Sequence, residues 1–351
     1  MKIAVYTIAK NEEKFVERWA ESCKEADYRI ILDTGSDDGT PELAEFIGVT
    51  VGIKIIDPWR FDHARNAALE LVPLDADYCI ALDMDEMLQP GWREALEKAT
   101  ASRPRYEYTW SWKEDGTPSL VYGGDKIHAR HGYFWHHPVH EVLSFREQET
   151  QEWIDLKIHH HPDNTKSRGQ YFPLLELAVE EDPDDDRNAH YLAREYFFHQ
   201  MHDKATAEFK RHLLLPNAVW RPERAASMRY LSKTEPSEQE SWLLRAAAEA
   251  PDRREAWVEL AQMYYLRNDW PSCYSAAVRA LGIVEKPLEY ICEEVAWGSV
   301  PNDMAAISSY RLGMFKVASW HAAKALEFNP SDERLVKNLE LCVAAMESSE
   351  Q

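Results

Sequence analysis

The chain has 351 residues, 45% of them hydrophobic, so it is long enough to bury more than one core, and two domains are expected. Its 61 acidic and 40 basic residues give a formal net charge of −21, which repels nucleic-acid phosphates and anionic lipids and disfavours both as partners. No apolar run approaches the roughly 20 residues of a membrane span, and the five cysteines show no CxxC spacing, so we expect a soluble, cytoplasmic protein with reduced core thiols.

The first hundred residues alternate short apolar runs with amphipathic stretches, which is typical of parallel strands joined by helices. The predicted elements, in chain order, are a strand at 3–8, a helix at 11–25, a strand at 28–33, a helix from residue 40, a strand at 49–56, a helix at 61–71 and a strand at 78–83. We therefore predict an α/β domain with a mostly parallel sheet and helices on both faces.

A different pattern follows in residues 105–158. Aromatic residues such as Tyr106 and Tyr108 recur at every second position, and Gly123-Gly124 is a turn signal, so we expect a β-ribbon and loops. Several tryptophans in this stretch suit a platform for an acceptor sugar, because aromatic faces stack on sugars. Ordinary packing between the ribbon and the sheet explains them equally well.

Helical periodicity takes over in the second half of the chain. Two of its segments match at an offset of 68 residues, twice 34, with Leu192 aligned to Leu260. A period of about 34 residues is typical of tetratricopeptide repeats, which are helix-turn-helix units, although a generic helical bundle is the alternative. We predict an α/β domain over 1–165 followed by an all-α, repeat-like domain over 172–351.

An acidic turn, Asp83-Met84-Asp85-Glu86, comes directly after the predicted strand at 78–83. Open α/β sheets bind ligands at the carboxyl ends of their strands, so these carboxylates should face a crevice. Asp83 and Asp85 could jointly bind a divalent cation, which would bridge a diphosphate and absorb its developing charge as a leaving group. Solvated surface carboxylates are the alternative, but the position directly after a buried strand favours the functional interpretation.

Two other polar turns end predicted strands. In ILDTGSDDGT the glycines allow a sharp turn, while Asp33 and Thr34 supply polar groups for a base or ribose edge. The segment TIAKNE, after the first strand, adds groups to the same crevice and contains no glycine, which disfavours a P-loop or a dinucleotide-binding GxGxxG loop. The first of these turns could also be a plain strand-to-helix connection.

The segments YTIAKNEE, ILDTGSDDGT, FDHARNAAL and ALDMDE, in this order and spacing, resemble the family 2 glycosyltransferases of the GT-A fold. The resemblance covers roughly residues 1–100 and extends more loosely to 165. With DTGS, ARNAAL, a later VHE and a repeat tail, the chain is similar to bacterial and phage members that carry both domains. It implies a hexosyltransferase that takes a sugar from a nucleotide-sugar, with UDP favoured, uses Mn²⁺ or Mg²⁺ through a DXD motif, and usually inverts the anomeric centre.

The resemblance also implies functions for single residues. The implied nucleotide-sugar-binding residues are Thr7, Ala9, Asn11, Asp33, Thr34, Arg65, Asn66, Asp83 and Met84. Asp83 should touch the ribose or a metal-bound water, and Asp85 should bind the metal directly. Many relatives have two adjacent aspartates at the positions of Asp33 and Thr34, so either residue could meet the base. For Arg65, a plain position on a helix surface is the alternative.

An inverting transfer needs a general base that takes the acceptor's proton. The candidate is Glu141 in the VHE segment, with His140 beside it to position the base or the donor, and Asp125 is the alternative. His160 shares a strand face with Ile158, so it should point inward and could complete the metal shell. The alternative for the histidines at 159–161 is the start of a histidine-rich linker.

Two other classes of function compete with this hypothesis. A nucleotidyltransferase would normally carry a glycine-rich loop after the first strand, and a non-catalytic adaptor that only binds a nucleotide-sugar would not need the intact acidic pair. The helical repeats are expected to bind the acceptor, a protein, peptide or glycan rather than nucleic acid, or to form a homodimer, because repeat domains present concave binding surfaces.

Overall fold

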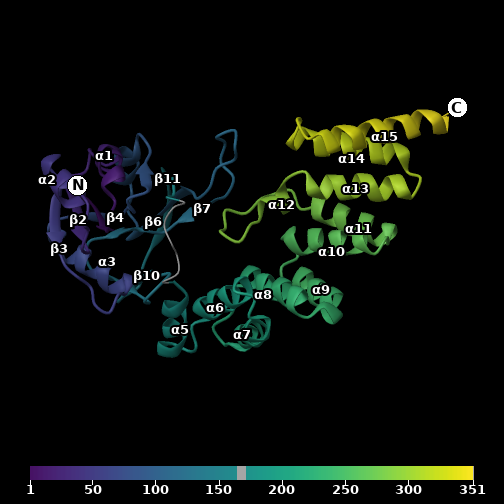
Figure 1. Ribbon diagram of the computed structural model, residues 1–351. Coiled ribbons are helices and arrows are strands. Elements are labelled where there is room, and N and C mark those ends of the chain that lie inside the picture. The colour runs from purple at the N-terminus through teal and green to yellow at the C-terminus, as the bar shows by residue number, and fades with distance from the viewer. Residues whose placement is uncertain (164–170, 351) are drawn as a thin grey trace. The chain divides into compact units, whose positions relative to one another are not determined.

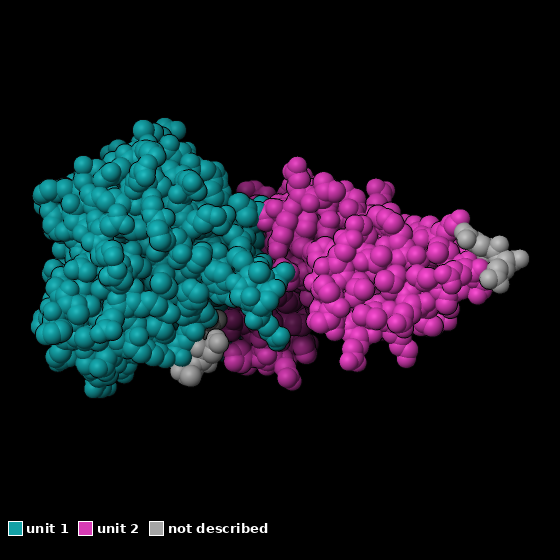
Figure 2. All heavy atoms as spheres, turned by 90° about the horizontal axis from the view of Figure 1, so that it is seen from above, with its two compact units in different colours: residues 1–181, 288–290 teal, residues 182–287, 291–351 magenta. Residues whose placement is uncertain are grey.

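The structure, a computed structural model, describes residues 1–163 and 171–350. The chain forms two compact units, one of residues 1–181 with 288–290 and one of residues 182–287 with 291–351 (Figures 1 and 2). Helix α5 (Tyr171–Glu181) belongs to the first unit, so this division falls beyond residue 172, the predicted start of the helical domain.

The first unit is built around a five-stranded sheet. Its order is β3 (Thr50–Ile53), β2 (Tyr28–Asp33), β1 (Ile3–Ala9), β4 (Tyr78–Ala81) and β8 (Ile127–Ala129). The first four strands are parallel and β8 is antiparallel to β4. The helices between them are α1 (Glu13–Ser22), α2 (Thr40–Phe46) and α3 (Phe61–Glu70). The predicted alternation of strands and helices is confirmed.

The two faces of this sheet bury separate cores, because successive side chains of a strand point to opposite faces. On β1, Ile3 and Val5 join a core with residues of α1, α2 and α4 (Trp92–Glu97). Ala4 and Tyr6 join the other core, to which α3 and the hairpin of β9 (Tyr133–His136) and β10 (Val142–Phe145) contribute. The predicted helices on both faces are therefore present.

A second sheet has the strand order β5 (Glu86–Leu88), β11 (Gln151–His160), β6 (Arg103–Thr109) and β7 (Val121–Gly124). Strands β6, β7 and β11 come largely from the predicted ribbon, whose other strands, β8, β9 and β10, lie elsewhere. The turn predicted at Gly123-Gly124 is wrong, because both glycines lie within β7. Gly124 pairs with Tyr106 of β6, and a Cβ atom there would overlap the tyrosine ring. Glycine at this position makes room for an aromatic ring.

In the second unit, the residues that the structure describes form helices and the loops that connect them. They are α6 (Asp186–Phe198), α7 (His202–Leu214), α8 (Arg221–Thr234), α9 (Gln239–Glu249), α10 (Glu255–Leu266), α11 (Trp270–Leu281), α12 (Glu294–Trp297), α13 (Val300–Arg311), α14 (Phe315–Phe328) and α15 (Glu333–Glu350), with a short 3₁₀ turn at Pro236–Glu238.

Consecutive helices of this unit pack in pairs, as in α6 with α7, α8 with α9 and α10 with α11. Helices α6, α8 and α10 begin at residues 186, 221 and 255, close to the predicted period of 34. Leu192 and Leu260, aligned in the sequence, are both buried. The prediction of an all-α, repeat-like domain is confirmed.

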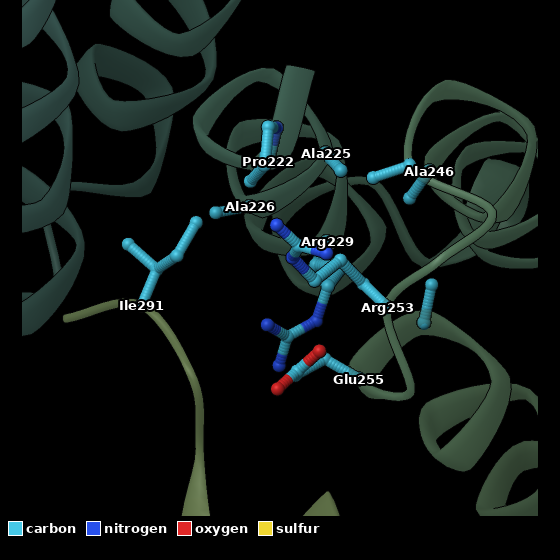
Figure 3. Close-up of a pocket in the computed structure, with 10 residues that line it drawn as sticks. Pro222, Ala225, Ala226, Arg229, Ala246, Arg253, Glu255 and Ile291 are labelled. Atoms are coloured by element: carbon cyan, nitrogen blue, oxygen red, sulfur yellow. The ribbon is translucent and has the colours of Figure 1, made fainter. Parts of the chain in front are cut away.

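A small hollow between α8, α9 and α10 is lined mainly by alanines, with Arg229, Arg253 and Glu255 among its charged residues (Figure 3). Arg229 forms ion pairs with Glu259 and Glu293 at 2.7 and 2.9 Å, and Glu255 accepts a hydrogen bond from the indole of Trp297. These contacts join neighbouring repeats, so the charges near the hollow have a structural function.

Two expectations from composition can be compared with the structure. All five cysteines lie in the described ranges, where each is buried and none forms a disulfide. Across residues 1–163 and 171–350, no helix combines the length and the apolar character that crossing a bilayer would require.

Candidate functional site

The acidic turn lies between β4 and β5, at the carboxyl end of a buried parallel strand. The main-chain N–H of Asp83 donates to the Glu86 carboxylate at 2.8 Å, which closes the turn. Antiparallel pairing of β5 with β11 sets Glu86 opposite His160. The turn is therefore held by two sheets, and its carboxylates have defined positions.

Asp83 is clamped between two cations. One carboxylate oxygen accepts from Arg65 Nη2 at 2.7 Å and the other from Lys126 Nζ at 2.6 Å. Burial disfavours the charged form of this carboxyl, but Arg65 and Lys126 outweigh it and hold the pKa of Asp83 well below its usual range. Asp83 is therefore a carboxylate at neutral pH and organises positive charge around itself.

Lys126 also contacts Glu86 at 3.0 Å, and Glu86 accepts from the Tyr108 hydroxyl at 2.6 Å. Burial disfavours the ammonium form of Lys126, yet Asp83 and Glu86 raise the pKa of Lys126. Burial also raises the pKa of Glu86, partly opposed by Lys126. Lys126 was not predicted from the sequence. It directly precedes the short strand β8, and its partners Asp83 and Glu86 lie far from it in the chain.

Arg65, on α3, joins the acidic turn to the VHE segment. Its Nε donates to Glu141 while Nη2 donates to Asp83, and the guanidinium lies 5.0 Å from the centre of the Trp135 ring. Its third nitrogen, Nη1, is buried and has no hydrogen-bond partner within the described part of the chain. Such an N–H could bind an incoming phosphate oxygen.

Asp85 meets a histidine rather than a cationic chain. His160 Nε2 lies 3.3 Å from Asp85 Oδ2, and His160 Nδ1 lies 2.9 Å from the Trp110 carbonyl oxygen. The ring stacks on the Trp110 side chain with centroids 4.3 Å apart. His160 is 5% exposed, as the strand pattern predicted. Burial lowers the pKa of His160, but the hydrogen bonds with Asp85 and Trp110 give a net rise.

Arg18, on α1, is a second residue that the sequence analysis missed. Its guanidinium lies 4.8 Å from the Phe15 ring, and its Nε and Nη2 atoms are buried without a hydrogen-bond partner in residues 1–163 and 171–350. Burial lowers the pKa of Arg18, opposed by the charge of Asp85. Arg18 lies within the predicted helix at 11–25 and outside the polar turns, so the sequence patterns did not single it out.

The turns after β1 and β2 form a second group of predicted residues. One Asp33 oxygen accepts from the main-chain N–H groups of Gly35 and Ser36 at 2.9 Å each, so this carboxylate shapes its own turn. The Thr34 hydroxyl donates to the Ala9 carbonyl at 3.0 Å. Asn11, which has a positive φ of 57°, accepts from the Asp37 N–H.

The remaining predicted residues lie nearby in the first unit. Thr7 and Met84 are buried. The amide of Asn66 exchanges two 2.8 Å hydrogen bonds with the main chain of Trp135, which fixes α3 to β9. His140 has a φ of 49°, and its ring lies 6.0 Å from that of Tyr171.

Asp125, the alternative base, takes part in another interaction. Its carboxylate accepts from Arg103 Nη2 at 3.1 Å, and its side chain is about half-exposed. The structure thus brings Asp83 and Glu141 into direct contact with Arg65 and brings Asp85 into contact with His160.

Part of the chain is similar in sequence to known glycosyltransferases. Residues 4–149 match the model of glycosyl transferase family 2. Over 123 residues the chain is 29% identical to the lipopolysaccharide core biosynthesis glycosyltransferase LpsC of Rhizobium meliloti, covering 34% of this chain and 44% of LpsC. Over 108 residues it is 32% identical to an uncharacterized glycosyltransferase of Rickettsia bellii, covering 30% and 35%. The chain thus spans less than half the length of these relatives.

Among solved structures, the chain is similar to the C-terminal part of a TPR repeat-containing protein from Cytophaga hutchinsonii, with 13% identity, a TM-score of 0.40 and coverage of 51% of this chain and 68% of that one. It is also similar to yeast Tom70, with 18% identity, a TM-score of 0.38 and coverage of 52% and 37%.

Proposed function

Since residues 4–149 belong to glycosyl transferase family 2, we propose that this protein transfers a sugar from a nucleotide-sugar to an acceptor. The favoured donor is a UDP-sugar. The observation that carries the proposal is the acidic turn at the end of β4, where Asp83 is held between Arg65 and Lys126 and Asp85 lies against His160. Carboxylates at this edge of an open α/β sheet are suited to a substrate crevice.

The cations of the site suit a diphosphate. Arg65 Nη1 and two nitrogens of Arg18 are buried donors with no partner in the described ranges, and phosphate oxygens would satisfy them. We propose that these groups receive the donor's phosphates. The turns containing Asn11, Asp33 and Thr34 would hold the base and ribose, with Thr7 and Ala9 at the end of the neighbouring strand.

Asp85 and His160 also suit a divalent cation. Their nearest ligand atoms, a carboxylate oxygen and an imidazole nitrogen, are 3.3 Å apart, a separation compatible with two ligands of one ion. Mn²⁺ accepts this mixed donor set, with substrate phosphates completing the shell. When bound, the ion would neutralise charge on the diphosphate. Asp83, already paired with Arg65 and Lys126, would bind the ion less directly than Asp85 does.

We propose that transfer inverts the anomeric centre in one displacement. An acceptor heteroatom would form a bond to the anomeric carbon while the bond from that carbon to the phosphate oxygen breaks, and the electron pair would leave with the nucleoside diphosphate. The acceptor's proton would pass to Glu141, which Arg65 orients. His140 would position this segment. Asp125 is less suited, because it pairs with Arg103.

The helical unit is proposed to recruit the acceptor, a protein, peptide or glycan, or to assemble a homodimer. Paired helices in a repeat array present extended surfaces for such contacts. Light scattering on the purified chain tests the dimer, and cross-linking to accepted substrates tests recruitment.

The proposed activity is tested by measuring release of nucleoside diphosphate from a panel of nucleotide-sugars with and without Mn²⁺. We expect turnover with a UDP-sugar and its loss, by at least about 100-fold, in Asp85→Asn. The matched control is Asp75→Asn, in the turn before β4, where the carboxylate meets Lys2 on the surface. Saturable binding without turnover would instead identify a non-catalytic adaptor, and full activity in Asp85→Asn would overturn the proposed site.

A further inference from the structure

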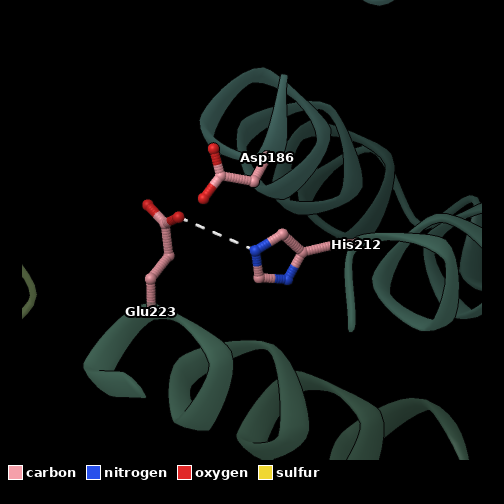
Figure 4. Close-up of side chains that lie close together, drawn as sticks. All are labelled: Asp186, His212 and Glu223. Carbon is pink, nitrogen blue, oxygen red and sulfur yellow. Dashed lines mark ion pairs between the residues drawn. The ribbon is translucent and has the colours of Figure 1, made fainter. Parts of the chain in front are cut away.

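The first repeat of the helical unit contains a buried cluster that the proposed transferase chemistry does not use. It consists of Asp186 in the first turn of α6, His212 in the last turn of α7 and Glu223 in the first turn of α8. One ligand atom from each residue lies within 4.8 Å of the others, and the side chains point toward one another (Figure 4). The three ligands thus come from three successive helices.

His212 has a nitrogen directed into this cluster. The side chain is fully buried, and Nε2 lies 3.7 Å from a Glu223 carboxylate oxygen, beyond hydrogen-bonding distance. Nε2 has no hydrogen-bond partner in the described part of the chain. A buried polar atom without a hydrogen-bond partner is destabilising, so this arrangement points to a ligand.

The other nitrogen of the ring is held by a hydrogen-bond chain. His212 Nδ1 lies 2.9 Å from Ser227 Oγ, and Ser227 Oγ lies 2.7 Å from His190 Nδ1. His190 Nδ1 can accept a hydrogen bond from the serine hydroxyl. Ser227 can then accept from His212 Nδ1–H, which leaves the lone pair of His212 Nε2 directed at the two carboxylates.

That tautomer is the one a metal ion requires. Metal-bound histidines commonly donate their second N–H to a neighbouring acceptor, which fixes the ring and raises its basicity. A divalent cation among the nitrogen lone pair and the two carboxylates would be attracted by all three groups.

We propose that Asp186, His212 and Glu223 bind one divalent transition-metal ion, with Zn²⁺ as the favoured ion. One imidazole and two carboxylates form a common donor set for Zn²⁺, with metal–ligand distances of about 2.0–2.2 Å. The present spacing would close by a small inward movement of the side chains. Asp186 is only partly buried, so the ion can enter beside it and a water can occupy the fourth position.

When bound, the ion would cross-link helices α6, α7 and α8, the first three helices of the second unit. It is independent of the cation proposed at Asp85 in the first unit, so failure of one site does not decide the other. The two are separated experimentally by working in an Asp85→Asn background.

The test is isothermal titration of the full-length, chelator-treated Asp85→Asn protein with Zn²⁺, together with its melting temperature. We expect one equivalent to bind and the melting temperature to rise. Adding His212→Gln should weaken binding at least tenfold and abolish the rise. The matched control, His202→Gln, removes an exposed histidine of the same helix and should change neither result.

Because His212 is fully buried, its replacement could unfold the unit. Asp186→Asn, at a partly exposed position, is therefore measured as well, with circular dichroism to confirm the helices, and should also weaken binding. Absence of Zn²⁺ binding, or equal affinity in the parent, His212→Gln and Asp186→Asn proteins, would show that the cluster is only an internal ion pair and overturn the proposal.

Discussion

Buried histidines differ between the two units in how their nitrogens are used. In the first unit, both nitrogens of His128 have partners: Nε2 lies 3.0 Å from the Tyr6 hydroxyl and Nδ1 lies 2.7 Å from the Ala129 carbonyl. In the second unit, His212 uses Nδ1 on Ser227 and directs Nε2 toward carboxylates. Both side chains are fully buried, so the two histidines differ in the partners of Nε2 and not in their burial.

His160 resembles His212 more than it resembles the neighbouring His128. One of its nitrogens faces a main-chain carbonyl and the other faces the Asp85 carboxylate. A histidine whose nitrogens are both used within the core stabilises the fold, whereas a fixed ring that presents its second nitrogen to carboxylates is arranged for a cation. The difference lies in the partners of the second nitrogen.

The strongest test of this comparison is His160→Phe. Phenylalanine keeps a ring that can stack on Trp110 but has no nitrogen for Asp85 or a cation. We expect transfer from the nucleotide-sugar to fall by about 100-fold, equivalent to about 2.7 kcal/mol of transition-state stabilisation. The measurement is kcat/KM as a function of Mn²⁺ concentration. The control is His159→Phe, on the opposite strand face and against Trp112, which should retain activity.

A smaller effect is expected from Lys126→Met, which removes one of the two cations on Asp83. The carboxylates of Asp83 and Glu86 would then lose the ammonium group that pairs with both of them at a mostly buried position. Breaking a buried pair costs about 3–5 kcal/mol, and because about a quarter of the Lys126 side chain is exposed we expect about 2–3 kcal/mol.

Hydrogen exchange of the backbone amides in β1 and β4 measures this loss of stability, because their protection gives the free energy of the local opening that exposes them. Lys98→Met removes a surface ion pair with Glu94 and should have no measurable effect. Unchanged protection in Lys126→Met would show that the ammonium does not stabilise the acidic turn.

Much of the fold followed from the sequence, because the two periodicities are local. The apolar runs of β1 and β4 and the 34-residue spacing of the helices depend on neighbours in the chain. The inward direction of His160 followed from strand alternation alone. Gly123-Gly124 failed as a turn signal because both glycines lie within β7, where Gly124 makes room for the Tyr106 ring from another strand.

The electrostatic part of the site was less accessible to sequence reasoning. Asp83 stood out because acidic residues are adjacent in the chain, but its partner Lys126 is 43 residues away and lies in no motif. Similarly, the cluster of Asp186, His212 and Glu223 is assembled by helix packing across the first repeat. Contacts of this kind are set by tertiary structure, so a single sequence does not reveal them.

The smallest expected effect concerns His128. Burial lowers the pKa of His128 to about 4, below the usual value near 6.5 of an unfolded chain. Between these values the unfolded state binds a proton that the folded state does not, so the free energy of unfolding falls as the pH drops through this window. Over pH 7 to 5 the loss attributable to His128 should be about 1.8 kcal/mol.

His128→Gln should remove this component, which is measured by comparing urea-unfolding midpoints at pH 7 and pH 5 with those of the parent. His63→Gln, at an exposed position on α3, should leave the pH dependence unchanged. If His128→Gln kept the full dependence, the neutral, doubly hydrogen-bonded state of this histidine would be wrong. In that case His128 would differ from His160 and His212 only in having no carboxylate neighbour among the residues that the structure describes. Resistance to protonation would no longer distinguish a structural imidazole from one that is arranged for a cation.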